Sequence, residues 1–250
     1  IVREGQAEGA VLLFHDITDL KRLEQVRRDF VANVSHELRT PISSIKGYAE
    51  TLIDGAVEDK PLAEEFIRII QSEADRLANL IEDLLDLSRL ESGKLELHLE
   101  ACSVKAIADK VIRDQREAAE ERSMTIVENI PEQTPEIRAD EDMITQVLIN
   151  LMDNAIKYTP AGGRIEISAR AMDRTVEVSV TDNGAGIPEK ELSRIFERFY
   201  RIDKARSRQM GGTGLGLSIV KHIIQEHGGE VKVKSVSGSG STFSFTVPRV

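Results

Sequence analysis

The feature that most limits the fold of this chain is a pair of long apolar stripes in its first third. From Leu20 to Leu52, apolar residues recur mainly at spacings of three, four and seven, as one face of a helix requires. After a turn around residues 54–61, a second stripe runs from Phe66 to Leu87 at near-heptad positions, which favours packing against another helix. Two helices alone cannot bury stripes this long, so we expect a helical hairpin that forms a homodimeric four-helix bundle.

After Gly93 the pattern changes to short alternating stretches and amphipathic segments that take turns along the chain. Alternation of apolar and polar residues is typical of strands, and its combination with helices indicates an α/β sandwich. We expect strands at 94–100 and 124–130, strand hairpins at 164–182 and 230–247, and helices at 103–122, 139–158 and 215–228, the second of these capped by Asp140.

The chain therefore divides into residues 1–17, 18–95 and 96–250. Residues 10–17 read as a lone strand with no sheet to join, which we interpret as the remnant of an upstream domain. No apolar run approaches the roughly 20 residues that span a bilayer. We expect a membrane anchor, if the native protein has one, only in a region upstream of this sequence.

Composition limits the classes of partner that the chain can bind and indicates the redox state of its compartment. The formal net charge of −10 argues against binding to nucleic acid or to an anionic membrane, because both are polyanions. Cys102 is the single cysteine, so no internal disulfide can form. Its lone occurrence fits a reducing, cytoplasmic compartment.

The stretch FVANVSHELRTPI places an ionisable His36 inside the first apolar stripe. His36 is two residues from both Val34 and Leu38, and two residues are about 200° of helical rotation, so His36 should point away from the core. An exposed neutral imidazole is a competent nucleophile near neutral pH. The alternative is an ordinary solvated histidine on the protein surface.

The residues that follow His36 exclude a zinc site of the His-Glu-x-x-His type. The zinc motif His-Glu-x-x-His needs a second histidine, but Thr40 stands at that position. Thr40 shares the exposed face of His36, and Glu37 is adjacent to it. Pro41 removes a helical hydrogen bond and clashes with the carbonyl of Glu37, so we expect a bent or loosened helix there.

Three later segments have the chemistry of a nucleotide site. Asn150 and Asn154 lie one turn apart on a helix face, where their oxygens could hold hydrated Mg²⁺, and Lys157 could neutralise phosphate. Asp182 ends a strand in TDNGAGI, where a carboxylate can accept a hydrogen bond from the adenine amine. Gly184 and Gly186 would let a planar base approach the backbone. The alternatives are ordinary helix-surface polarity and an ordinary Asn-Gly turn.

The third segment, GGTGLGLSIV, places glycines directly before a helix, where free N–H groups and the helix dipole favour phosphate. It has the Walker A spacing from Gly211 to Gly216, but Leu217 replaces the required lysine and no strand precedes it. A basic loop stands before it and could form a phosphate lid; the alternative is a solvated charged loop. Its cations are Arg198, Arg201, Lys204, Arg206 and Arg208.

In this order, SHELRTP, NLMDNAIKY, DNGAGI, FERFYR and GGTGLGL resemble the H, N, G1, F and G2 boxes of bacterial two-component sensor histidine kinases. The resemblance covers residue 18 to the end. It implies a dimerisation and histidine-phosphotransfer domain at 18–95 and a catalytic ATP-binding domain at 96–250. The latter would have the Bergerat (GHKL) fold that gyrase, Hsp90 and MutL share. Residues 1–17 resemble the last strand of a PAS domain. The resemblance to sensor kinases further implies that the full-length protein is anchored in the bacterial membrane through its N-terminal region.

The resemblance also implies residue roles. His36 would accept the phosphoryl group, and Glu37 would orient or deprotonate His36. Thr40 would act in dephosphorylation of the partner, and Pro41 would bend the helix. A response-regulator receiver domain would supply the accepting aspartate, docking near Ser44, Tyr48 and Thr51. ATP and Mg²⁺ would bind at Asn150, Asn154, Lys157, Tyr158, Asp182, Gly184, Gly186, Arg198, Arg201, Gly212, Thr213, Gly214, Leu215, Gly216 and Thr242, with Asn150 and Asn154 serving the metal.

Two other functions use the same nucleotide fold. In an ATPase or chaperone machine the helical bundle would only dimerise the chain, but such a machine needs no exposed His-Glu pair before a proline. A non-catalytic scaffold is the other alternative. A degenerate site has no reason to keep Asn150, Asn154, Asp182 and the glycines together.

Overall fold

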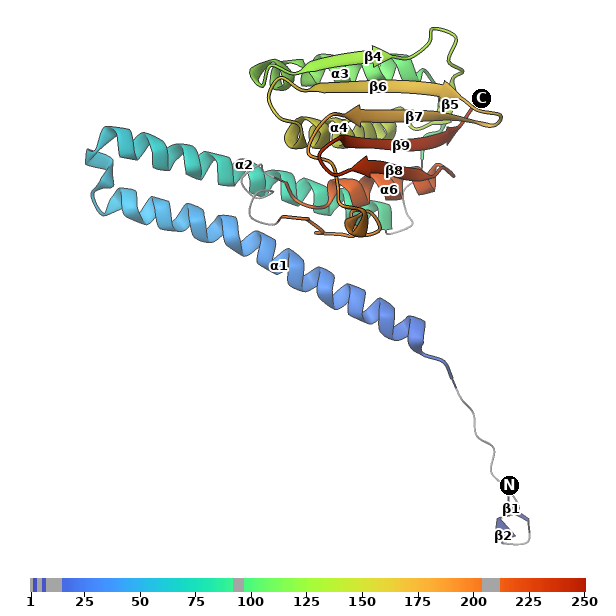
Figure 1. Ribbon diagram of the computed structural model, residues 1–250. Helices are drawn as coiled ribbons and strands as arrows, with labels where there is room; N and C mark the ends of the chain where they lie inside the picture. The colour runs from blue at the N-terminus through green and yellow to red at the C-terminus, as the bar shows by residue number, and fades with distance from the viewer. Residues whose placement is uncertain (1, 4–5, 8–14, 92–96, 204–211) are drawn as a thin grey trace.

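The chain forms a long helical hairpin packed beside an α/β sandwich (Figure 1). We describe a computed structural model, which places residues 2–3, 6–7, 15–91, 97–203 and 212–250. Helix α1 (Thr18–Ile53) and helix α2 (Lys60–Glu91) are the two arms of the hairpin, joined by the 3₁₀ turn η1 (Ala56–Glu58). The hairpin and the sandwich expected from the sequence are therefore both present.

The hairpin has the local structure that its turn predicts. The side chain of Asp59 accepts a hydrogen bond from the backbone N–H of Leu62 (3.3 Å), so it stabilises the start of α2. Tyr48 and Phe66 then pack across the two arms with ring centroids 5.0 Å apart. Helix α1 continues through Pro41 without interruption, and Pro41 itself is buried. Ile42, expected on the buried stripe, is 52% exposed in the single chain.

The sandwich is built on a five-stranded sheet with one parallel and three antiparallel pairings. Its strand order is β4-β6-β7-β9-β8, and β4 and β6 form the parallel pair. Helices α3, α4 and α6 cover one face of this sheet (Figure 1). The strands are β4 (Thr125–Asn129), β6 (Arg164–Ala171), β7 (Thr175–Asp182), β8 (Val231–Val236) and β9 (Gly240–Pro248), and the helices are α3 (Val104–Glu121), α4 (Glu141–Tyr158) and α6 (Gly216–Glu226).

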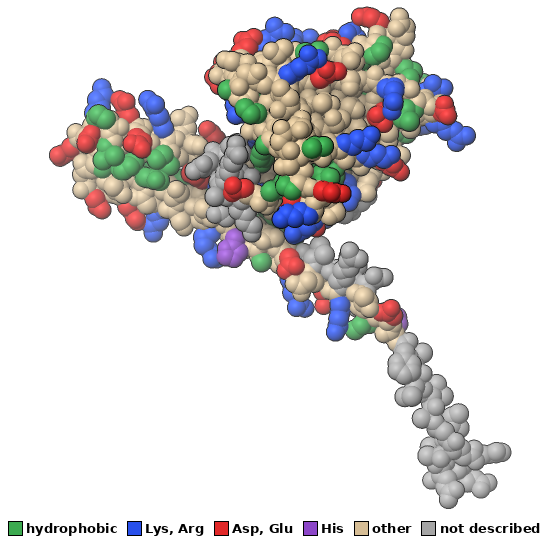
Figure 2. Space-filling view, in the orientation of Figure 1, with side chains coloured by type: hydrophobic (Ala, Val, Ile, Leu, Met, Phe, Trp, Pro, Cys, Tyr) green, Lys and Arg blue, Asp and Glu red, His purple; other side chains and the backbone are tan. Residues whose placement is uncertain are grey.

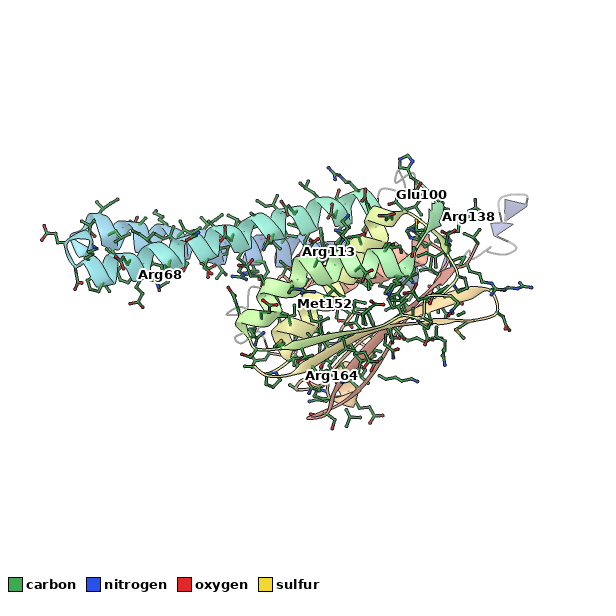
Figure 3. All side chains as sticks on the ribbon, turned by 90° about the horizontal axis from the view of Figure 1, so that it is seen from above. Arg68, Glu100, Arg113, Arg138, Met152 and Arg164 are labelled. Carbon is green, nitrogen blue, oxygen red and sulfur yellow. The ribbon has the colours of Figure 1, made fainter. Side chains whose placement is uncertain are left out.

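Burial alternates along the strands, which shows that the core lies between the sheet and the helices. Every second residue of β7 is buried against the helices, while the residues between are partly exposed, as a sheet with one covered face requires. Met152 of α4 is fully buried and points into the layer between helices and sheet (Figure 3). In contrast, Arg68 lies on the part of α2 that extends beyond the sandwich (Figure 3).

Helix α2 belongs to the same core as the sandwich. Its buried leucines Leu80, Leu87 and Leu90 join the continuous cluster of apolar side chains that fills the sandwich. Its C-terminal half packs against α6. The hairpin and the nucleotide-binding fold are thus docked on each other in this structure, which the sequence did not predict.

One strand prediction was misplaced and one strand was missed. Of the strand expected at 94–100, residues 94–96 lie outside the described residues and 97–99 are not in a strand. Strand β3 covers Glu100–Cys102 and pairs antiparallel with β5 (Ile137–Ala139), which the sequence pattern missed. Three residues are too few to show an alternating pattern, so pairing alone defines these strands.

At the N-terminus, residues 15–17 are not in a strand, and 8–14, with most of the strand expected at 10–17, lie outside the described residues. A short hairpin joins β1 (Val2–Arg3) to β2 (Gln6–Ala7). Among the residues placed, no helix is both long and apolar enough to cross a membrane.

Candidate nucleotide and phosphoacceptor site

A cavity of about 380 Å³ opens between α2, α4, the end of β7 and the start of α6. It gathers side chains from segments that are far apart in the sequence. Its lining comprises Asn79, Glu82, Asp83, Asp86, Gln146, Ile149, Asn150, Asp153, Asn154, Lys157, Tyr158, Asp182, Ala185, Gly186, Ile187, Ile195, Tyr200, Arg201, Ile202, Gly212, Thr213, Gly214, Gly216, Leu217, Ser241 and Phe243. Most of the nucleotide-binding residues expected from the sequence are therefore brought together.

Helix α4 supplies the polar face of the cavity. Asp140 caps this helix as expected, because its Oδ1 accepts a hydrogen bond from the N–H of Met143 (3.2 Å). Asn150 and Asn154 then line the cavity from successive turns. The Nδ2 of Asn150 is buried and has no hydrogen-bond partner among the described residues. A buried amide donor without a partner costs free energy, so this group fits a site that binds an oxygen-rich ligand.

Asp182, the last residue of β7, also lines the cavity. Its Oδ1 accepts a hydrogen bond from the N–H of Gly184 (2.8 Å). Burial raises the pKa of the Asp182 carboxyl above its ordinary value, and the N–H groups of Gly184 and Ser241 oppose that rise. Gly186 has a φ of +66°, and a Cβ there would lie 2.0 Å from the carbonyl oxygen of Val236. Only glycine fits this turn without displacing backbone.

One of the expected ATP-binding residues is not among those that line the cavity. Thr242 is on the face of β9 opposite to Ser241 and shares a 3.0 Å hydrogen bond with Thr181. Ser241, which pairs in register with Asp182, lines the cavity instead. Successive residues of a strand point to opposite faces, so an error of one position exchanges the two.

The glycine segment forms the third wall. Gly212, Thr213, Gly214 and Gly216 line the cavity, and Gly216 is the first residue of α6. A Cβ at Gly216 would lie 3.1 Å from the Oδ1 of Asn150, so this glycine lets α6 approach α4 closely. Leu215 is fully buried and supports the segment from below. Gly211, Lys204, Arg206 and Arg208 lie outside the described residues.

Helix α2 forms a fourth wall, which no sequence pattern predicted. The Oγ1 of Thr213 donates a hydrogen bond to the Oδ2 of Asp83 (2.6 Å). The Nε2 of Gln146 donates one to the Oδ2 of Asp86, also at 2.6 Å. Burial raises the pKa of Asp83, and the hydrogen bond from Thr213 opposes this rise. Both acids read as ordinary polar positions of an amphipathic helix, so only docking reveals them.

His36 is exposed on α1, as its spacing from Val34 and Leu38 predicts. Both of those apolar residues pack against the core. Among the described residues, none that lines the cavity comes from α1. The phosphoacceptor candidate and the nucleotide cavity are therefore separate in this arrangement. Thr40 is exposed one turn further on, and its hydroxyl donates a hydrogen bond to the carbonyl of His36 (3.1 Å).

Glu37, next to His36, is held by two arginines. The Nη2 of Arg76 on α2 donates to its Oε2 at 2.9 Å, and the Nη2 of Arg201 does so at 3.1 Å. Arg201 comes from the sandwich and also donates to the carbonyl of Thr213 (2.6 Å). The Glu37 side chain is only 13% exposed. The docked arrangement thus joins the neighbour of His36 to the wall of the nucleotide cavity.

The segment before the glycines also contacts the hairpin. Phe199 has a φ of +61°, which is uncommon for a residue with a side chain. Its ring lies 5.9 Å from that of Phe30 on α1. The guanidinium of Arg198 lies over the same Phe30 ring, 5.4 Å from its centroid. Arg198, expected beside the nucleotide, is therefore not among the residues that line the cavity.

Fold and site together define a nucleotide-binding α/β sandwich docked on a helical hairpin that presents an exposed histidine. Two family models match the chain. His Kinase A (phospho-acceptor) domain matches residues 26–93, and histidine kinase-, DNA gyrase B- and HSP90-like ATPase matches residues 139–250. The chain belongs to the family of sensor histidine kinases.

Relatives agree with this assignment. The sensor histidine kinase WalK of Bacillus subtilis is 40% identical over 98% of this chain, which spans about 40% of the length of that relative. Histidine kinase ThkA, solved in complex with response regulator TrrA, gives a TM-score of 0.73 with 28% identity over 94% of this chain and 68% of its own. Full-length ShkA in complex with AMPPNP gives 0.66 and 31% over 91% of this chain and 46% of its own.

Proposed function

We propose that this chain transfers the γ-phosphoryl group of ATP to a ring nitrogen of His36, and then to an aspartate of a response regulator. One observation carries the proposal. The chain has both an exposed histidine with an adjacent carboxylate on α1 and a cavity with the chemistry of a nucleotide site. An ATPase machine would have the cavity but no use for the histidine.

The residues that line the cavity support ATP as its ligand. The buried carboxylate of Asp182 would accept a hydrogen bond from the adenine amine, and Ile187, Ile195 and Phe243 give that end apolar walls. At the other end, Lys157 and the N–H groups at the start of α6 would take the phosphates. ShkA, a relative of this chain, was solved with the ATP analogue AMPPNP.

The donor set at the phosphate end also fits Mg²⁺. Amide oxygens are ligands that this ion accepts, together with water and phosphate oxygens. Asn150 and Asn154 would hold it from one face of α4. When bound, Mg²⁺ neutralises charge on the transferring phosphoryl group.

In the reaction, the ring nitrogen of His36 forms a bond to the γ-phosphorus while the bond from this phosphorus to the β,γ-bridging oxygen breaks, and ADP leaves. Catalysis of this kind depends mostly on positioning and charge. Glu37 would orient the imidazole or accept its proton. In the docked arrangement Glu37 is instead occupied by Arg76 and Arg201, so the sandwich must leave this position before His36 can react.

We also propose a homodimer formed by the hairpin, with domains at residues 18–95 and 96–250. Apolar side chains gather toward the free end of the hairpin (Figure 2), and the exposed ones there include Ile53, Val57 and Ile67. A surface of this kind is typical of an interface between proteins. The two family models match inside the proposed domains.

The partner we propose is a receiver domain, because ThkA was solved in complex with a response regulator. It would dock on α1 below His36, where Thr51 is exposed while Ser44 and Tyr48 are half-buried. The hydroxyl of Thr40, exposed one turn from His36, would position water for dephosphorylation of that partner. We further propose that any membrane anchor lies outside this sequence.

A labelling experiment tests the main reaction. Incubation with γ-labelled ATP and Mg²⁺ should give a label that is stable in base and labile in acid, as a phosphohistidine is. His36→Gln should remove the label, while the variant His222→Gln, on α6, should keep it. Label that persisted in His36→Gln, or that survived acid, would contradict the proposal.

A further inference from the structure

The nucleotide cavity carries an unexpected charge. ATP is a polyanion, yet acidic side chains outnumber basic ones among the described residues that line the cavity. The acids are Glu82, Asp83, Asp86, Asp153 and Asp182, and the cations are Lys157 and Arg201. Three of these five acids come from α2, the helix that docks against the sandwich.

The two cations are already engaged by acids. The Nζ of Lys157 lies 3.9 Å from the Oδ2 of Asp153. Arg201 bonds to Glu37 at 3.1 Å. In the docked arrangement, the charges that would attract phosphate are therefore partly neutralised, and the carboxylates of α2 face the same space.

The α2 carboxylates lie at the phosphate end of the cavity. Asp83 accepts a hydrogen bond from Thr213, which is three residues before the first residue of α6. Asp86 accepts one from Gln146, which is one helical turn before Asn150 on α4. They thus lie beside the helix N-terminus and the asparagine that would receive the triphosphate.

We propose that Asp83 and Asp86 make α2 a charge-selective wall of the nucleotide site. When α2 is docked, the site accepts an adenosine group but disfavours the phosphates in proportion to their charge. Binding of the triphosphate accordingly displaces α2 and frees the sandwich. This proposal rests on the proposed function, since it needs ATP to bind in this cavity.

The physical reason is repulsion between like charges in a partly buried site, where solvent screens them less than at the surface. Because coupling between two binding events is reciprocal, a wall that weakens triphosphate binding is itself weakened by the triphosphate. The hydrogen bonds from Thr213 and Gln146 need only an oxygen acceptor, so an asparagine can keep them while losing the charge.

The test is calorimetric binding of adenosine, ADP and AMPPNP to the whole chain in the presence of Mg²⁺. The double variant Asp83→Asn with Asp86→Asn should bind AMPPNP roughly tenfold tighter than the wild type. It should bind ADP with a smaller gain and adenosine unchanged. Added salt should shrink the gain. Asp75→Asn removes one charge from an exposed position on the same helix and should change none of the three affinities.

Hydrogen exchange supplies a second, independent measurement. In the wild type, AMPPNP should speed amide exchange over residues 79–86 of α2, while adenosine should not. An equal gain for adenosine in the double variant would overturn the charge mechanism, because it would indicate only looser docking. A loss of AMPPNP affinity would overturn it too, since the acids would then be helping to bind Mg²⁺. If no ligand bound to any form, the proposed ATP site itself would fail.

Discussion

At the scale of single residues, the site consists of groups that are costly for the fold. Asp182 is buried with a raised pKa, and the Nδ2 of Asn150 is buried without a partner among the described residues. Neither group improves packing, so both are better explained by a ligand than by stability. Phe199 is a third costly position near this cavity, because its backbone has a positive φ.

Asp182→Asn should separate binding from stability. A carboxyl whose pKa is raised on folding favours the folded state below its ordinary value of 3.8, and this contribution is lost as the pH rises through the raised value. At neutral pH the buried charge therefore opposes folding. The variant should show an equal or higher Tm at pH 7 by calorimetry, and it should lose labelling by ATP.

The matched control is Asp173→Asn, which removes an exposed charge in the β6–β7 turn and should change neither property. The Tm advantage of Asp182→Asn should also shrink as the pH falls, because the wild-type carboxyl, with its raised pKa, becomes protonated. A Tm lowered by several degrees at pH 7 would mean that the carboxylate stabilises the fold.

At the scale of elements, α4 is the helix that positions the site. Asp140 fixes its start through both carboxylate oxygens, which accept from the N–H groups of Met143 (3.2 Å) and His98 (3.1 Å). The N–H of Asp140 in turn donates to the Nε2 of the buried His227 (3.0 Å). One residue thus links the start of α4 to the end of α6, the two helices that bring Asn150 and the glycine segment together.

Asp140→Ala should therefore cost more than an ordinary cap. Loss of an N-cap side chain typically costs about 0.5–2 kcal/mol, and we expect the upper end of that range in the free energy of unfolding from urea denaturation. Asp142→Ala, an exposed acid in the first turn of the same helix, should cost less than about 1 kcal/mol. The backbone N–H of Asp140 keeps its bond to His227 in the variant, so the cost measures the two side-chain bonds to Met143 and His98. Equal costs for the two variants would show that these side-chain bonds add nothing.

At the scale of the whole molecule, the docked arrangement keeps the chemistry apart. Glu37 is held by Arg76 and Arg201, Phe30 packs on Phe199, and Asp83 bonds to Thr213. The contacts of Arg201, Phe199 and Thr213 join the sandwich to the hairpin. Arg76 holds Glu37 from within the hairpin. The proposed phosphoryl transfer needs Glu37 free of these contacts, so we expect the chain to alternate between two arrangements.

The dimer can be tested at this scale as well. Ile67 is 55% exposed on α2, and Ile67→Asp would place a charge in the proposed bundle, where it could not be solvated. Sedimentation should show the wild type as a dimer and this variant as a monomer. Met172→Asp changes a similarly exposed residue of the sandwich, at 42%, and should leave the dimer intact. A monomeric wild type would contradict the bundle.

The periodic elements and the local motifs could be predicted from the sequence. Helical stripes, caps and strand alternation depend on neighbouring residues, so the hairpin, the start of α4 at Asp140 and the exposure of His36 followed from spacing alone. The placement of Asn150, Asn154, Asp182 and the glycines at one cavity also agrees with the prediction from their motifs.

Features that depend on contacts between distant segments became known from the three-dimensional structure. It placed Ser241 instead of Thr242 at the cavity, paired β3 with β5, and docked α2 on α6. Strand register and docking are set by the fit of whole surfaces, which no local pattern records. For that reason the acids of α2, ordinary surface positions in the sequence, become a wall of the nucleotide site.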